Sequence, residues 1–302
     1  MIVTAYDPQS SSFISGLEAI QARAQRAQRE LTTGLRINTV SDAPNQIPNL
    51  LQVQASIAHN DQVTLNLGRV KTETDTAESA ISNAVTQLQQ AQTLATQGAS
   101  DMDSASTRQD LAQAMGAVLQ NLVSLANTSV EGRYVFSGDE DQQMPYSIDL
   151  TQASPISAYA GSASTRQIQA PDGTFFQISE TAQTIFDPSD SQSSVFQAVN
   201  NARVALLNND SAGLNAAIGQ LSTASTYLNN QLAFYGLTQD KVATATNDGA
   251  NLETSLKTEL SGIEDADMTQ SITDLTQAQT QEQAALSSEA ELPRKTLFDY
   301  LG

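Results

Sequence analysis

The chain has 302 residues, of which 33 are acidic and 14 are basic, so its formal net charge is −19. This charge argues against nucleic acid and against a membrane surface as partners, because both are bound through clustered Lys and Arg. The chain holds no Cys and a single His, which excludes thiol chemistry, Cys-type zinc sites and clusters of His ligands. Aromatic residues make up 5% of the chain, a composition that favours thin helical packing over a compact aromatic core.

The N-terminal stretch MIVTAYDPQSSSFISG has no basic segment, no long apolar segment and no small-residue cleavage site. It therefore does not resemble a cleaved secretory signal. No stretch approaches the length of uninterrupted apolar sequence that a transmembrane helix needs, so none is predicted. We expect any export of this protein to use a route that leaves the N-terminus intact.

Residues 13–33 carry apolar residues at steps of three and four, which predicts a helix that packs along another helix. A loop with apolar Leu35 and Ile37 follows, and we expect these two side chains to be exposed and to contact another subunit. The alternative is that they fold back on their own helices. The apolar positions of this first helix are Leu17, Ile20, Ala24, Ala27 and Leu31.

A second helix is predicted from about Asn45 to about residue 98. A continuous helix over these residues would be about 80 Å long. Pro44 and Pro48 are tolerated at its start because the first amides of a helix have no partner within it. A third helix is predicted around residues 111–125. The apolar positions of the second helix are Val63, Leu67, Val70, Thr74, Ala77, Ile81, Ala84, Leu88, Ala91 and Ala95.

A mostly β segment is predicted from residue 134 to about residue 188, between helical runs, because Tyr134, Val135 and Phe136 favour strands. Two short strands are expected around the Pro-Asp-Gly turn within RQIQAPDGTFFQI. Helix resumes near Ser194, with Phe196, Val199 and Leu206 on one side, and a second very long helix follows it. Its apolar positions are Leu214, Ile218, Leu221, Leu228, Leu232, Tyr235, Val242, Leu256, Leu260 and Ile263.

A final helix after GIEDADM carries Ile272 and Leu275, and its charge is opposite to that of the first helix. Residues 258–293 hold eight acidic residues and no Lys or Arg, whereas the first helix and its loop hold four Arg. Opposite charges favour association of the two terminal helices, although each exposed pair contributes only a few tenths of a kcal/mol. The alternative is that the charges belong to solvated faces of unrelated helices.

The stretch RAQRELTTGLRINTVSDAPN resembles the N-terminal signature of bacterial flagellins and their junction relatives. SGIEDADMTQSITDLTQAQTQEQAAL resembles the family's C-terminal signature, and two signatures in order at opposite ends are more specific than either alone. The APNQIPN segment departs from the run of small residues that the family usually has after Pro. The matching positions are Leu31, Thr32, Gly34, Arg36, Ile37, Asn38, Ser41, Asp42, Ile263, Glu264, Asp265, Ala266, Asp267, Leu275, Thr276 and Ala284.

Three details favour the hook–filament junction branch of the family over the filament subunits. Pro44 stands in SDAPNQ, GRYVFSGD resembles a motif that precedes the β region of junction proteins, and TLFDYLG resembles their C-terminal ending. A short filament flagellin is the alternative within the family. A helical enzyme whose catalytic residues come from several chains is the alternative outside it.

The resemblance implies a mainly α fold of long antiparallel helices with a small β insert. The implied domains are terminal coiled-coil segments (1–44 with 262–302), a long helical domain (45–133 with 190–261) and a β-rich outer insert (134–189). The implied location is extracellular, in the flagellum. The implied partners are further copies in a ring, another hook-associated protein on the hook side, flagellin on the filament side, a cytosolic export chaperone and the flagellar export apparatus.

We expect the assembly interface to lie in the terminal helices, the loop and the C-terminal segment. The residues predicted for it are Leu17, Ile20, Leu31, Leu35, Arg36, Ile37, Asn38, Asp42, Ile263, Glu264, Asp265, Ile272, Leu275, Leu297, Phe298, Tyr300 and Leu301.

Catalysis is not predicted. His59 is alone within a polar part of a predicted helix, and we expect it to face solvent. The acidic clusters SGDEDQQ and IEDAD lack the Asp-x-Asp-x-Asp-Gly spacing of a calcium loop. No phosphate-binding glycine motif or nucleophile-elbow motif is present. We therefore expect a non-enzyme with no cofactor and no metal.

Overall fold

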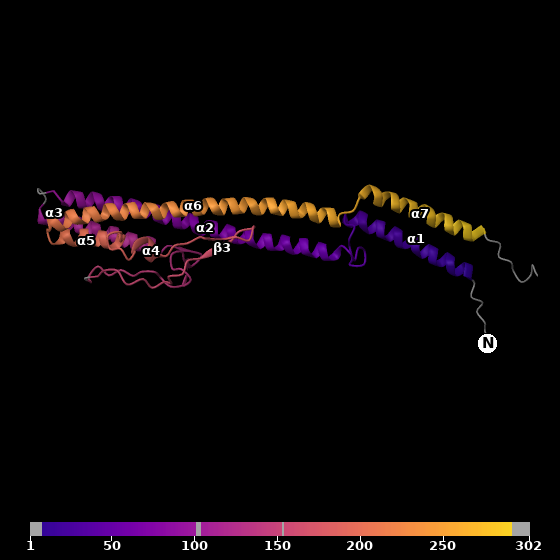
Figure 1. Cartoon of the computed structure of the whole chain (residues 1–302), viewed down its shortest axis with the longest axis horizontal. Coiled ribbons are helices and arrows are strands. Elements are labelled where there is room, and N and C mark those ends of the chain that lie inside the picture. The colour runs from indigo at the N-terminus through magenta and orange to yellow at the C-terminus, as the bar shows by residue number, and fades with distance from the viewer. Residues whose placement is uncertain (1–7, 101–103, 153, 292–302) are drawn as a thin grey trace, which may run out of the picture. The chain divides into compact units, whose positions relative to one another are not determined.

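The computed structural model of the protein describes residues 8–100, 104–152 and 154–291. The described chain is mainly helical (Figure 1), which confirms the predicted fold class of long helices with a small β part. The helices are α1 (Pro8–Thr33), α2 (Ile47–Gly98), α3 (Ala105–Ala126), α4 (Ala182–Phe186), α5 (Val195–Leu207), α6 (Ser211–Glu264) and α7 (Met268–Glu291).

The chain divides into two compact units. Unit 1 comprises Met1–His59 and Glu253–Gly302, and unit 2 comprises Asn60–Leu252. Helices α2 and α6 each contribute residues to both units, and the β insert belongs to unit 2 together with the long helices. The predicted three-part division differs from this one and stays a prediction.

The core of unit 2 is formed by α2, α3, α5 and α6 together with residues of the insert. Every apolar position predicted for the second helix, from Val63 to Ala95, is buried. On α6 the predicted Ile218 and Leu232 are half-buried, whereas Ala217 and Ala224, which the sequence pattern did not single out, are buried. Small residues at these positions leave space into which the neighbouring side chains pack.

Helices α2 and α6 approach closely at Gly249. Buried Asn60 donates a hydrogen bond from Nδ2 to the Gly249 carbonyl oxygen over 2.9 Å. A Cβ at position 249 would lie 3.0 Å from Thr64 Oγ1 and 3.4 Å from Cγ of Pro171, a residue of the insert. The contact therefore holds two long helices and the insert together, and it has no room for a larger residue.

The strands form two antiparallel pairs. β1 (Ser129–Val130) pairs with β2 (Arg133–Tyr134), and β3 (Gln167–Gln169) pairs with β4 (Phe175–Gln177). The second pair confirms the two strands predicted around the Pro-Asp-Gly turn. Gly173 has a φ of +86°, a conformation that glycine adopts without a steric penalty.

The prediction of a mostly β segment was wrong in extent, because most of residues 134–188 is irregular and α4 lies within it. Val135 and Phe136 follow β2 but are not part of a strand. Phe136 is fully buried, and its ring packs edge-on against Phe186 and Tyr235. Packing of this ring into the helical core takes the place of strand pairing here.

Tyr159 anchors the insert to this aromatic core. Its hydroxyl donates to the carbonyl oxygen of Phe136 over 2.9 Å, and its ring lies 5.6 Å from that of Tyr146. Burial raises the pKa of Tyr159 to about 12 from the ordinary value of 10.0. Burial also raises the pKa of Tyr146. The neutral phenols are therefore part of the folded state.

We predict that Gly249→Val destabilises unit 2 by about 1–3 kcal/mol, because the added methyl groups enter a packed contact. Urea unfolding followed by circular dichroism measures this change. Gly219→Val is the matched control in the same helix, since nothing beyond the neighbouring backbone of that helix lies within 4 Å of its added Cβ. Equal stability of the two variants would contradict the close approach at Gly249.

We predict that stability falls as the pH rises from about 10 to about 12, because the pKa of Tyr159 is higher in the folded chain than in the unfolded one. The contribution is complete below the unfolded pKa and is lost as the pH rises through the folded pKa. Tyrosinate absorbance and circular dichroism across this range measure the loss. Tyr159→Phe should be less stable than the parent at neutral pH yet lose less stability over that interval. If Tyr159→Phe lost as much stability as the parent over this pH range, the assignment of the pH dependence to Tyr159 would be contradicted.

Candidate assembly interface

Helices α1 and α7 of unit 1 pack side by side and antiparallel (Figure 1), which confirms the predicted pairing of the terminal helices. The contact follows the predicted apolar positions. Ala27 of α1 and Ala278 of α7 are buried, each with 3% of its surface exposed. Larger residues predicted for the interface line the seam without being fully covered. The half-buried ones are Leu17, Ile20, Leu31 and Leu275.

This seam is thin. Among the described side chains of the pair (residues 11–33 and 268–290), the buried ones are Ala27, Ser271 and Ala278. Burying one methyl group contributes about 0.8 kcal/mol, whereas ordering one residue costs about 1–2 kcal/mol of backbone entropy. The pair therefore gains little from its own contact, and it leaves Ile14 and Ile272 more than half exposed.

Backbone contacts join the two sequence signatures, which lie more than 200 residues apart in the chain. Gly34 directly follows α1, its φ of +74° suits the position after a helix end, and its amide donates to Glu30 O. Beyond it, the Arg36 amide donates to Glu264 O over 2.6 Å, and the Ala266 amide donates to Gly34 O over 2.9 Å. The end of α1 is thereby fixed beside the start of α7.

The side chain of Arg36 adds to this linkage. Its Nη2 donates to the Ile263 carbonyl oxygen over 2.5 Å and to Gln46 Oε1 over 2.7 Å. The first bond holds the last turn of α6, and the second holds the chain just before α2. One guanidinium thus ties together three segments of unit 1.

Asp42 organises the loop between α1 and α2. Its Oδ2 accepts hydrogen bonds from the amides of Thr39 (2.7 Å) and Asn38 (3.0 Å). The pKa of Asp42 lies below its ordinary value, chiefly because of the hydrogen bond from the Thr39 amide. The Asn38 amide and the charge of Arg26 lower this pKa more weakly. The carboxylate form of Asp42 is therefore the one that holds the loop.

Asp267 starts α7. Its Oδ1 accepts from the amides of Thr269 and Gln270, and its carbonyl oxygen accepts from the Ser271 amide. This is the geometry of an N-cap, which satisfies amides that have no partner within the helix. The acidic cluster IEDAD thus joins the end of α6 to the start of α7.

The expectation that Ile37 is exposed on the loop was wrong, because 6% of its surface is accessible and the rest is covered by its own chain. Leu35 is half-buried and its backbone pairs with Asp265. Val40 is the exposed apolar side chain of this loop, at 68%. Leu297, Phe298, Tyr300 and Leu301, which were also predicted for the interface, lie outside the described residues.

Opposite charge does not join α1 to α7 by ion pairs within the described part of the chain. The carboxylates take neutral partners instead. Glu282 accepts from Gln21 Nε2 over 2.9 Å, and Glu30 accepts from Ser271 Oγ over 2.8 Å. The helices pair as predicted, but the Arg side chains of α1 form no ion pair with α7 within the described chain.

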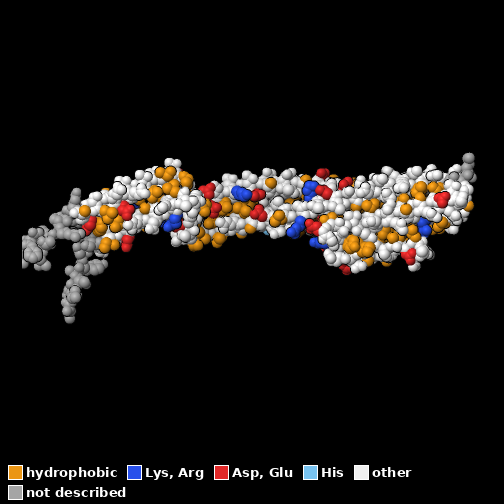
Figure 2. Space-filling model, turned by 180° about the vertical axis from the view of Figure 1, so that it is seen from behind, with side chains coloured by type: hydrophobic (Ala, Val, Ile, Leu, Met, Phe, Trp, Pro, Cys, Tyr) orange, Lys and Arg blue, Asp and Glu red, His pale blue; other side chains and the backbone are white. Residues whose placement is uncertain are grey.

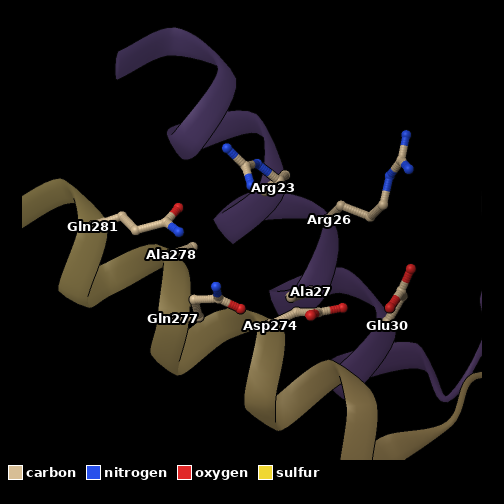
Figure 3. Close-up of a pocket in the computed structure, with 8 residues that line it drawn as sticks. All are labelled: Arg23, Arg26, Ala27, Glu30, Asp274, Gln277, Ala278 and Gln281. Atoms are coloured by element: carbon tan, nitrogen blue, oxygen red, sulfur yellow. The ribbon is translucent and has the colours of Figure 1, made fainter. Parts of the chain in front are cut away.

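A groove of about 220 Å³ follows the seam between α1 and α7 (Figure 3). The small side chains of Ala27 and Ala278 leave this space, and Arg26 points away from α7 at its edge. The residues that line the groove are Arg23, Arg26, Ala27, Glu30, Asp274, Gln277, Ala278 and Gln281.

The described residues hold no group of three or more His, Asp or Glu placed to bind a metal ion. His59 is exposed, as predicted. On the face shown in Figure 2, Lys and Arg side chains lie beside Asp and Glu and do not gather into one basic patch. No described helix has the length and apolarity needed to cross a membrane.

We predict that Arg36→Ala loosens the loop of residues 34–46, because it removes two hydrogen bonds of a charged donor, each worth about 1.5–3 kcal/mol. Hydrogen exchange should accelerate at the amides of Arg36 and Ala266 while the amides of unit 2 keep their protection. Arg29→Ala is the matched control, because Arg29 is exposed on the preceding helix α1 and is in no ion pair within the described chain. Unchanged exchange in Arg36→Ala would show that the guanidinium does not hold the loop.

Two sequence families match the chain. "Bacterial flagellin N-terminal helical region" matches residues 8–141, and "Bacterial flagellin C-terminal helical region" matches residues 216–301. Together they cover well over half of the chain. Both of the paired terminal helices, α1 and α7, fall inside these matches, whereas most of the β insert falls outside them.

Curated relatives and a solved structure agree with this result. The chain is 25% identical to "Flagellar hook-associated protein 3" of Salmonella typhimurium, over 94% of this chain and 95% of the relative. It is 27% identical to the Escherichia coli protein of that name, over 57% of this chain and about half (53%) of the relative. The crystal structure of Bacillus cereus FlgL shares the fold, with a TM-score of 0.58 and 20% identity over 70% of this chain and 99% of that one. The chain therefore belongs to the bacterial flagellin family, and its similarity there is to the hook-associated protein 3 group.

Proposed function

We propose that this protein is a structural component of the bacterial flagellum at the junction between hook and filament, where copies assemble into a ring through their terminal helices. The observation that carries the proposal is the thin seam between α1 and α7. Within the described side chains this pair buries two alanines and a serine, and it needs further apolar cover to become stable. Neighbouring copies in a ring supply that cover.

The surface left open on the pair is suited to such contacts. Ile14, Ile272 and Leu286 are each at least half exposed, and Met268 is 45% exposed at the start of α7. In a family whose relatives are hook-associated proteins, an incomplete helix pair of this kind is an assembly element rather than a defect. Ile37 is not part of the proposed surface, because its own chain covers it.

The ring would lie outside the cell, between another hook-associated protein on the hook side and flagellin on the filament side. Delivery there requires export, and we include a cytosolic chaperone and the flagellar export apparatus among the partners. The family resemblance supports these partners. The protein acts by joining, so no catalytic step is assigned to it.

Immunogold electron microscopy of detached flagella tests the location. Antibody against this chain should label one band beside the hook. Label along the whole filament would instead make the protein a filament flagellin, the alternative within the family. Absence of label from flagella would overturn both assignments.

We predict that Ile272→Asp abolishes attachment to the flagellum while the isolated chain stays folded, because this side chain is 56% exposed in the single chain. Motility on soft agar and circular dichroism of the purified protein measure the two effects. Leu237→Asp is the matched control, since Leu237 is 64% exposed on α6 in unit 2. Normal motility with Ile272→Asp, or equal loss with the control, would count against an interface on the terminal pair.

A further inference from the structure

The two helices of the terminal pair carry opposite charges that their own contact does not use. Arg23, Arg26 and Arg29 are exposed on α1, and none of them is in an ion pair within the described chain. On α7, Asp274 and Glu289 are exposed, and no Lys or Arg stands among its described side chains. Each helix therefore presents a charged face without an ionic partner.

Three of these charged side chains line the groove along the seam. Arg23 and Arg26 stand on its α1 side, and Asp274 stands on its α7 side (Figure 3). The three Arg residues follow one another at steps of three, which places them along one slanted ridge of the helix. A second copy that offers its acidic helix to this ridge would bring opposite charges together, and its own basic ridge would remain for the next copy.

We propose that the α1 face of one copy, formed by Arg23, Arg26 and Arg29, binds the acidic α7 face of a second copy, formed by Asp274 and Glu289. This inference rests on the proposed assembly of the chain through its terminal helices. The occupant is a second copy because this chain carries both members of the complementary pair, and charge complementarity between faces selects the partner and its orientation.

The contact has a direction. A basic face on one helix meets an acidic face on a different helix of the neighbour, so each copy keeps one face of each sign for the copies on its two sides. Such a heterologous contact propagates into a ring or a helix, whereas a contact of one face with itself closes as a dimer. The placement of the charges thus gives polarity to the ring that the proposed function requires.

Charge reversal in two separate chains tests the proposal. The first variant is Arg23→Glu with Arg29→Glu, which makes both faces acidic. The second is Asp274→Arg with Glu289→Arg, which makes both faces basic. Each variant alone brings like charges together, and attachment to the hook should fall by at least about tenfold. In cells that express both, acidic α1 faces meet basic α7 faces and basic α1 faces meet acidic α7 faces, so attachment and motility should return.

The mixture separates contacts between copies from contacts within one. Within a single chain both variants keep two like-charged helices, and mixing cannot change that. Failure of the mixture would therefore overturn the proposal, as would normal attachment of either variant alone. Arg69→Glu with Lys241→Glu is the control for the first variant, because it makes the same change in net charge at exposed residues of unit 2. The parent chain must restore motility to a strain that lacks it, and if it does not, the proposed function itself fails. Immunoblots of the culture medium confirm that every variant is exported.

Discussion

The backbone contact between residues 34–37 and 264–266 is the constraint on which the rest of unit 1 depends. It fixes the end of α1 beside the start of α7, and Arg36 extends the contact to the last turn of α6 and to Gln46. Once the two ends are fixed, the helices have little freedom except to lie along each other. The two helices can then pair through a seam that buries two alanines, although such a seam could not bring two separate helices together.

The two units are stabilised by different means. Unit 2 buries large side chains completely, among them Phe136, Met115 and Leu88, and its core needs nothing from outside the chain. The terminal pair buries small residues and keeps its aliphatic side chains at the surface. Local stability follows buried apolar contact, so unit 2 is the persistent part of the fold and the terminal pair is the part that gains most from a partner.

The sequence predicted the long helices well because their pattern is regular. The apolar spacing from Val63 to Ala95 marked a face that is buried throughout. Prediction from the sequence failed where the structure depends on contacts between residues that are distant in the chain. Ile37 lies in a loop whose shape comes from bonds to Glu264, and apolar character alone does not show whether such a residue turns inward. Ala217 and Ala224 were missed because alanine favours helices on any face, so its presence alone does not mark the buried side.

Thin packing and unused charge in the terminal pair are two aspects of one requirement. An open apolar face large enough to bind tightly would also bind wrong partners and promote aggregation. Charged ridges stay hydrated in the free chain, they repel a copy that approaches in the wrong orientation, and they attract one that offers the opposite face. The apolar residues between the ridges then contribute to the binding free energy once the orientation is correct. On this argument the strong acidity of α7 is not a general adaptation to solvent, because α1 keeps three exposed Arg residues in a chain whose net charge is −19.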